Sequence, residues 1–171
     1  MNYATIKPWD IANGPGVRVS LFVSGCTHHC KDCFNPEAWD FDYGEPFTEA
    51  VMDHILELLR PDYIRGITYL GGEPFDPHNQ PGLLALTQKI RAAYPEKSIW
   101  SVTGYVYGQN LPQLPGVTDA LLAGLDVLVD GPFIAARKNL GLRFRGSDNQ
   151  RLIDLPKTLK TGAVVLWDET Q

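Results

Sequence analysis

Apolar runs along the chain alternate with stretches in which apolar residues recur every three or four positions. The runs predict strands at residues 17–23, 67–70, 99–102 and 125–129. The helical spacing predicts one helix from the cap residue Thr48 to the stop at Pro61 and another over about 81–94. One or two helical turns are expected at 118–123, irregular structure at 134–151, and a late strand at 164–167.

Strands that alternate with helices indicate parallel β-α-β units. The chain has 171 residues, whereas a complete eight-fold barrel needs about 250. We therefore expect an α/β fold of four to six strands: a partial, open (β/α) barrel with a mostly parallel, curved sheet. A single domain is expected over residues 1–171, with no predicted position for the part that begins at about residue 152.

The composition is that of an ordinary globular protein, with a formal net charge of −5. A general nucleic-acid binder would show a basic surface, so this class is not favoured. No apolar run approaches the roughly 20 residues of a membrane span, and the N-terminus lacks the regions of a signal peptide. These features, with three cysteines too few for a disulfide framework, predict a protein of the reducing cytoplasm.

All three cysteines lie within eight positions, as Cys26, Cys30 and Cys33 with the spacing C-x3-C-x2-C. A cubane iron–sulfur cluster has four iron corners, so three thiolates would leave one iron free to bind another ligand. A zinc site of three cysteines and one histidine is an alternative. His28 and His29 lie in the first spacer, where we expect short tethers to point them away. Three unrelated buried cysteines are the remaining reading.

Several chemically distinctive residues follow predicted strands directly. They are the cysteine loop, the turn Gly71-Gly72-Glu73, Thr103 and Asp130. Because ligands of parallel α/β sheets bind at the carboxyl ends of the strands, these residues are expected on one rim. Glycines at 71 and 72 would let a ligand approach the backbone, and a branched residue at 72 would then obstruct it. Thr103 and Asp130 could equally be turn residues.

The cysteine loop resembles the cluster motif of the radical S-adenosylmethionine (SAM) enzymes. The chain also resembles the activating proteins of glycyl-radical enzymes, and most closely those of the anaerobic (class III) ribonucleotide reductases. The matching blocks keep their order between about residues 3 and 151, at 10–18, 20–26, 34–39, 71–74, 103–105, 127–133 and 145–150. The broad superfamily often has an aromatic residue just before the third cysteine; here Asp32 stands there and Phe34 follows.

The resemblance implies a radical SAM oxidoreductase with a [4Fe-4S] cluster on Cys26, Cys30 and Cys33. It also implies SAM binding by residues near that cluster, with Phe34 against the adenine: Gly71, Gly72, Glu73, Thr103, Asp130 and Phe34. SAM would be cleaved to methionine and a 5′-deoxyadenosyl radical, which takes hydrogen from a glycine loop of the large reductase subunit. A flavodoxin-type reductant is the implied electron donor. No catalytic residue beyond the cluster ligands is expected.

Three other functions remain open at this point. The chain could activate a formate-lyase-type enzyme, or act on a nucleobase-like small molecule with the same radical chemistry. It could instead be a zinc-binding interaction module without enzymatic activity. Some residues also keep two interpretations: Arg18 as a strand-end charge or an anion contact, and residues 143–151 as a solvated loop or a lid or partner contact. The aromatic residues Trp39, Tyr105 and Phe133 could line a cavity or belong to the core.

Overall fold

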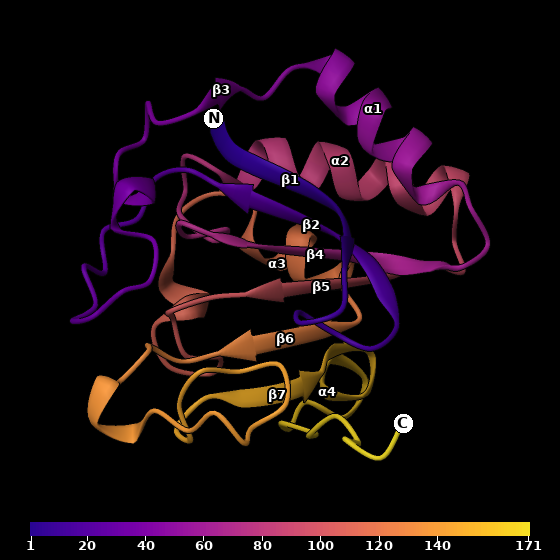
Figure 1. Cartoon of the computed structure of the whole chain (residues 1–171). Coiled ribbons are helices and arrows are strands. Elements are labelled where there is room, and N and C mark those ends of the chain that lie inside the picture. The colour runs from indigo at the N-terminus through magenta and orange to yellow at the C-terminus, as the bar shows by residue number, and fades with distance from the viewer.

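The computed structural model describes residues 1–171 and contains one seven-stranded sheet of order β3-β1-β2-β4-β5-β6-β7 (Figure 1). The strands are β1 (Asn2–Asp10), β2 (Val17–Val23), β3 (Glu45–Pro46), β4 (Ile64–Gly71), β5 (Ser98–Val102), β6 (Val127–Asp130) and β7 (Arg151–Asp154). The α-helices are α1 (Glu49–Leu59), α2 (Gln80–Ala93), α3 (Thr118–Ala123) and α4 (Leu155–Thr161). Short 3₁₀ turns lie at η1 (Pro36–Trp39), η2 (Leu111–Gln113) and η3 (Ala135–Arg137).

The centre of the sheet is parallel and its edges are antiparallel. Strands β2, β4, β5 and β6 pair in parallel. At one edge β1 pairs antiparallel with β2 and β3 with β1, and at the other β7 pairs antiparallel with β6. The sheet is therefore mixed and does not close on itself, so the expected parallel character holds only for its centre.

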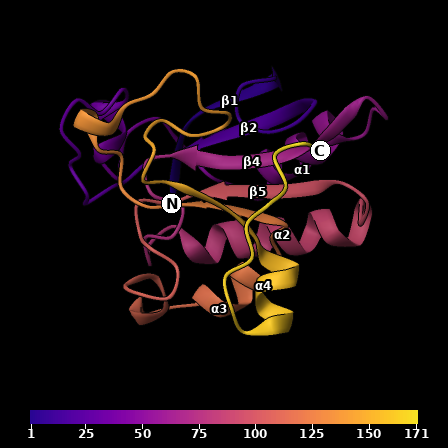
Figure 2. The same cartoon turned by 90° about the horizontal axis from the view of Figure 1, so that it is seen from below.

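The two faces of the sheet carry different side chains. One face contributes Val19, Leu21, Ile67 and Tyr69 to a core that is shared with the helices. Figure 2 shows α2, α3 and α4 on this side of the sheet and the segment between β6 and β7 on the other. Helices thus cover one face, and the opposite face is free to form the wall of a cavity. None of the helices combines the length and apolar character that crossing a membrane requires.

Arg18 belongs to that opposite face and is the second residue of β2, which agrees with its interpretation as a strand-end charge, whereas its burial was not predicted. Its side chain is fully buried, and its guanidinium donates to Thr68 Oγ1 (3.0 Å), Ser98 Oγ (2.8 Å) and the Ile67 carbonyl (2.9 Å). The guanidinium also lies 5.4 Å from the centre of the Trp100 ring. Burial lowers the pKa of Arg18 to about 10. Arg18 therefore links β2 to β4 and β5 instead of facing solvent or an anion.

The sequence pattern missed the elements at the two edges of the sheet. Strand β1 has few fully buried residues, and Pro8 and an irregular register before Asp10 obscure its alternation. Strand β7 has only four residues and leads straight into α4, where Asp154 accepts from Lys157 N (3.0 Å) as the cap. The late strand expected at 164–167 is reduced to a single bridge between Leu166 and Ile153.

Candidate functional site

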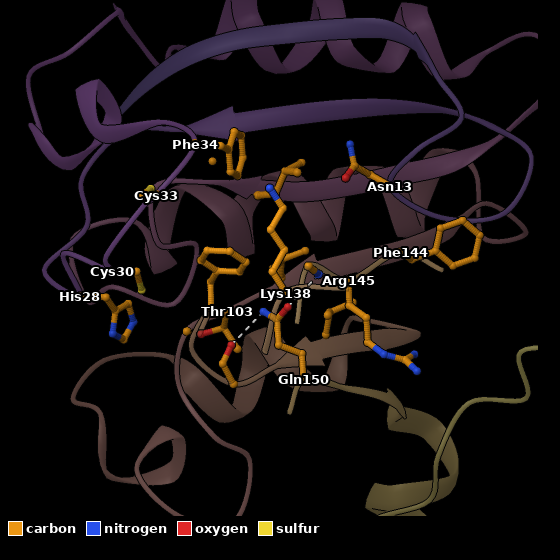
Figure 3. A pocket seen from close by; sticks show the side chains of 18 of the residues that line it. Asn13, His28, Cys30, Cys33, Phe34, Thr103, Lys138, Phe144, Arg145 and Gln150 are labelled. Atoms are coloured by element: carbon orange, nitrogen blue, oxygen red, sulfur yellow. Dashed lines mark hydrogen bonds between the residues drawn. The ribbon is translucent and has the colours of Figure 1, made fainter. Parts of the chain in front are cut away.

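A cavity of about 500 Å³ opens where the parallel strands end. Its size is in the range of small-molecule sites. Most of the residues singled out in the sequence line it: Cys26, Cys30, Cys33, Phe34, Gly71, Gly72, Glu73, Thr103 and Phe133. Figure 3 shows several of them as sticks, with Cys30, Cys33 and His28 on one side and Lys138 and Gln150 from the opposite loop. The carboxyl ends of four strands thus supply one common site.

The cysteine loop is held to the end of the sheet by backbone hydrogen bonds. Gly25 N donates to Ala38 O (2.8 Å) and Cys26 N donates to Trp39 O (3.2 Å), so η1 closes the loop. His29 and Asp32 have left-handed backbones, with φ of 51° and 58°, and each directly precedes a cysteine. This conformation is uncommon outside glycine and marks positions that the surroundings hold in place. Two such turns direct the chain back towards the cavity before Cys30 and Cys33.

The three thiols are free and half-buried. Burial raises the pKa of the Cys26 thiol to about 11, although N–H groups of His28 and His29 act in the opposite direction. Burial also raises the pKa of Cys30, against a hydrogen bond from the Phe133 N–H. A bound metal compensates the thiolate charge that burial disfavours.

The cysteine donors beside the cavity are three free thiols. No group of three or more His, Cys, Asp and Glu side chains is arranged to hold a single metal ion. Thiolates on a cubane cluster each bind a different iron, so such ligands stand further apart than those of one ion. Three thiols are the donor type of an iron–sulfur cluster, and the two neighbouring histidines have other contacts, His28 with Glu73 and His29 with Trp39.

The Gly-Gly-Glu turn packs directly on the cysteine loop. Gly72 N donates to Val23 O (2.7 Å) and Glu73 N donates to Gly25 O (2.8 Å). A Cβ atom at residue 72 would lie 2.5 Å from Gly25 O and 3.0 Å from Ala38 O. The expected obstruction of a ligand is thus not the main reason for this glycine: a side chain would push the cysteine loop away.

Glu73 is buried, and its carboxylate accepts four hydrogen bonds from the protein. Oε1 accepts from Phe75 N (2.8 Å) and Thr103 Oγ1 (2.7 Å). Oε2 accepts from Gly104 N (2.8 Å) and from His28 Nε2 (2.8 Å). A carboxylate has about four acceptor positions, so all are taken. Glu73 places a fixed negative charge on the cavity wall and joins the cysteine loop to the ends of β4 and β5.

His28 is the residue of this network that sequence reasoning missed. Its ring lines the cavity and packs edge-to-face on Tyr105, with ring centres 4.5 Å apart. The hydrogen bond to Glu73 raises the pKa of His28 above its ordinary value, although burial acts against it. His29 instead stacks on Trp39 at 4.5 Å. No sequence signal identified His28, because its partner lies 45 residues away.

Asp130 does not line the cavity. Its buried carboxylate accepts from Tyr107 N (2.8 Å) and from Arg151 Nε (2.9 Å). The expected place in the SAM site is therefore corrected: the aspartate fixes the end of β6 against β7. Trp39 and Tyr105 are likewise absent from the lining, and both pack on histidines of the cysteine loop.

The mouth of the cavity combines apolar and basic side chains. Phe34 lines it with 80% of its surface exposed, and Leu140 lines it at 88%. Lys138 also lines the mouth, and its side chain makes no hydrogen bond or ion pair. Asn13, from the turn after β1, lines the cavity as well (Figure 3). Neither Asn13 nor Lys138 was singled out from the sequence. Residues 138–146 supply most of one wall, which places part of the former irregular loop in the site.

Comparisons with known proteins identify similar chains. A family model described as a 4Fe-4S single cluster domain matches residues 12–153. Proteins named anaerobic ribonucleoside-triphosphate reductase-activating protein are 44% identical over 152 residues in Escherichia coli K12 and 43% identical over 152 residues in Vibrio cholerae serotype O1. Both alignments cover 88% of this chain and 96% of the relative. The protein of that name from Enterobacteria phage T4 is 41% identical over 154 residues, with 89% and 93% covered.

Proposed function

The chain belongs to the family of anaerobic ribonucleoside-triphosphate reductase-activating proteins, with a 4Fe-4S cluster domain, and we propose that it activates such a reductase by radical SAM chemistry. One electron cleaves SAM to methionine and a 5′-deoxyadenosyl radical. That radical takes a hydrogen atom from the Cα of one glycine of the large reductase subunit, giving 5′-deoxyadenosine and a stored glycyl radical. The protein would thus be an enzyme of the radical SAM oxidoreductase class.

Cys26, Cys30 and Cys33 would hold a [4Fe-4S] cluster. Its proposed place is supported by three free thiols that line one cavity. When bound, the cluster supplies the electron and an open iron for the methionine part of SAM. The chain itself contributes the left-handed turns that direct the cysteines inward and the η1 contacts that fix the loop.

SAM would occupy the cavity beside the cysteine loop. SAM carries a sulfonium and an ammonium group, and the buried Glu73 carboxylate lies on the wall with its negative charge fixed by four donors. Gly71 and Gly72 would face the methionine part, and Thr103 would act through its hydrogen bond to Glu73. Phe34 at the mouth would cover the adenine, since its exposed ring is free to stack. The fixed charge favours a cation without any reorganisation of the wall.

The partner would approach the mouth of the cavity. The glycine loop of the large subunit must bring one Cα to the radical, and exposed Phe34 and Leu140 offer apolar contacts there. A flavodoxin-type protein is the proposed electron donor. The names of the relatives favour the reductase over a formate-lyase-type enzyme or a nucleobase-like substrate.

One observation carries this function. Three free cysteines and the buried Glu73 line the same cavity, of about 500 Å³, at the carboxyl ends of the parallel strands. The test is anaerobic incubation with the large reductase subunit, SAM and a strong reductant, followed by electron paramagnetic resonance. A glycyl radical on the reductase supports the proposal. One tightly held zinc ion per chain, with no SAM cleavage after anaerobic reconstitution, would instead support an interaction module.

A further inference from the structure

We propose that the C-terminal residues 164–169 position the wall of the cavity, by holding residues 138–146 against the sheet through Trp167 and Glu169. The inference rests on the proposed function, because the cavity is taken to bind SAM. Trp167 and Glu169 are then positioning residues: neither lines the cavity, and both act through the loop that does.

The loop of residues 138–146 has little structure of its own to hold it over the cavity. Its base is closed by the bridge between Lys138 and Ser147 and by Asn139 N, which donates to Gly146 O (3.2 Å). Beyond that base its backbone makes two internal hydrogen bonds, from Leu142 N to Asn139 O (3.3 Å) and from Gly141 N to Asn139 Oδ1 (2.9 Å), and both involve Asn139 at the base. The far part of the loop must therefore be fixed by contacts from elsewhere.

Two arginines of the loop bind the same residue of the C-terminal segment. Arg143 Nη1 donates to the backbone carbonyl of Glu169, and Arg145 Nη1 pairs with the Glu169 carboxylate. Between them, Phe144 has a left-handed backbone with φ of 60°. A residue with a Cβ keeps this conformation only where its surroundings impose it. The two contacts to Glu169 hold the residues on either side of Phe144.

Phe144 connects the same loop to the sheet through aromatic contacts. Its ring lies 5.5 Å from Trp100, on β5, and 6.3 Å from Trp167. The rings of Trp100 and Trp167 are 4.9 Å apart, all three pairs meeting edge-to-face. Trp167 N donates to Leu152 O of β7 (2.8 Å), which fixes the segment at the sheet edge. A continuous path thus runs from the sheet through Trp167 to the cavity wall.

Glu169 also sets the charge on that wall. Arg145 lines the cavity with only 17% of its side chain exposed, and its Nε is buried without a hydrogen-bond partner. The Glu169 carboxylate neutralises this guanidinium. Without it, the wall would present a second uncompensated positive charge, beside that of Lys138, to SAM, which is itself a cation. Loss of Glu169 should therefore weaken SAM binding through both the position and the charge of the wall.

The experiment compares Glu169→Gln and Trp167→Leu with the control Asp168→Asn, in the cluster-containing protein. Asp168 lies between the two positions, but its carboxylate accepts from Thr170 and makes no hydrogen bond or ion pair with the loop. The rate of tryptic cleavage after Arg143 and Arg145 measures how firmly the loop is held. Anaerobic equilibrium dialysis with labelled SAM measures the Kd of SAM. We expect faster cleavage in both variants and a rise of about 5–10-fold in the Kd of SAM, which is the size of one typical net hydrogen bond. The KM of reductant-driven SAM cleavage should rise, with kcat and iron content unchanged.

Two results would overturn the proposal. Unchanged tryptic cleavage in both variants would show that the C-terminal segment does not hold the loop. Faster cleavage with an unchanged Kd would show that the held loop does not position the SAM site. If the unmodified protein bound no SAM at all, the proposed function would fail, whereas the cleavage rates would still decide whether the segment positions the loop.

Discussion

The imidazole Nε2 of His28 lies 2.8 Å from Glu73 Oε2, and this contact joins the cysteine loop to the turn after β4. Glu73 also binds Thr103 and Gly104, which follow β5. One buried carboxylate thus fixes the relative positions of three segments that surround the cavity. The proposed sites for the cluster and for SAM therefore depend on the same side chain.

Glu73→Gln tests this dependence. The amide keeps the size of the side chain but removes its negative charge. Its NH₂ group would also replace one carboxylate oxygen that accepts hydrogen bonds from the protein. We expect the Kd of SAM to rise by about tenfold or more, because the negative charge beside the cationic ligand is lost; tenfold corresponds to about 1.4 kcal/mol. Glu37→Gln, on the short turn η1 and exposed, is the matched control. Equal SAM affinity in the two variants would contradict the role of the buried charge.

Gly72→Ala should damage the cluster site rather than only the SAM site. Its Cβ would meet Gly25 O at 2.5 Å, so the cysteine loop would have to shift. We expect lower iron and sulfide content, and a loss of roughly 1–3 kcal/mol in the free energy of unfolding from overpacking. Gly141→Ala, where the nearest atom is the side-chain oxygen of Asn139 at 3.2 Å, is the control. Full cluster content in Gly72→Ala would refute this reason for the glycine.

Replacing any one of Cys26, Cys30 or Cys33 by Ala should abolish the cluster and SAM cleavage together. The chain has three cysteines and all are used, so no spare thiol can substitute. Iron and sulfide analysis, with measurement of 5′-deoxyadenosine, checks both losses in each variant. A variant lacking all three cysteines that still cleaved SAM would eliminate the cluster assignment.

Asp10 should make the stability of the turn beside the cavity depend on pH. Burial acts to raise the pKa of Asp10, but hydrogen bonds from Ala12 N, Ser20 Oγ and Asn13 Nδ2 together hold it below the usual value. A lowered pKa in the folded state adds stability that is complete above the unfolded pKa, near 3.8, and is lost as the pH falls towards the folded value.

Asp10→Asn should therefore lose less stability on acidification than the unmodified chain. The free energy of unfolding is measured with urea at a series of pH values from neutral down to the pKa region of Asp10. The cluster-free protein is used, because acid would destroy a cluster. Asp62→Asn, an exposed carboxylate without a hydrogen bond, serves as control. Identical pH slopes for the Asp10 variant and the unmodified protein would contradict the prediction.

The sequence predicted the centre of the fold better than its edges. The apolar run at 17–23 is β2 with the same bounds, and the helix at 118–123 is α3. Strand β2 is almost entirely buried, and α3 buries Thr118, Leu121 and Leu122 at helical spacing, so local pattern and packing agree. Strand β1 is half-exposed and contains Pro8, so its pattern is weak. Short strand β7 depends on pairing with β6, which no local window contains.

In the candidate site, too, the sequence predicted local motifs but not contacts between distant residues. The cysteine spacing and the Gly-Gly-Glu turn are local motifs and were visible in the sequence. The partners of their side chains are not local: His28 meets Glu73 across 45 positions, and Arg151 meets Asp130 across 21. The burial of Arg18 was not predicted for this reason, since its acceptors at Thr68 and Ser98 lie on other strands. Which charges are buried and paired is decided by tertiary packing.

The most direct test of the account is the origin of one hydrogen atom. The protein, with its cluster, is incubated anaerobically with SAM, a strong reductant and the large subunit of an anaerobic ribonucleotide reductase labelled with deuterium at glycine Cα. The account predicts a glycyl radical on the reductase whose doublet collapses with the label, and deuterium in 5′-deoxyadenosine. No radical on the reductase, together with repeated turnover of a small molecule that supplies the hydrogen, would contradict it.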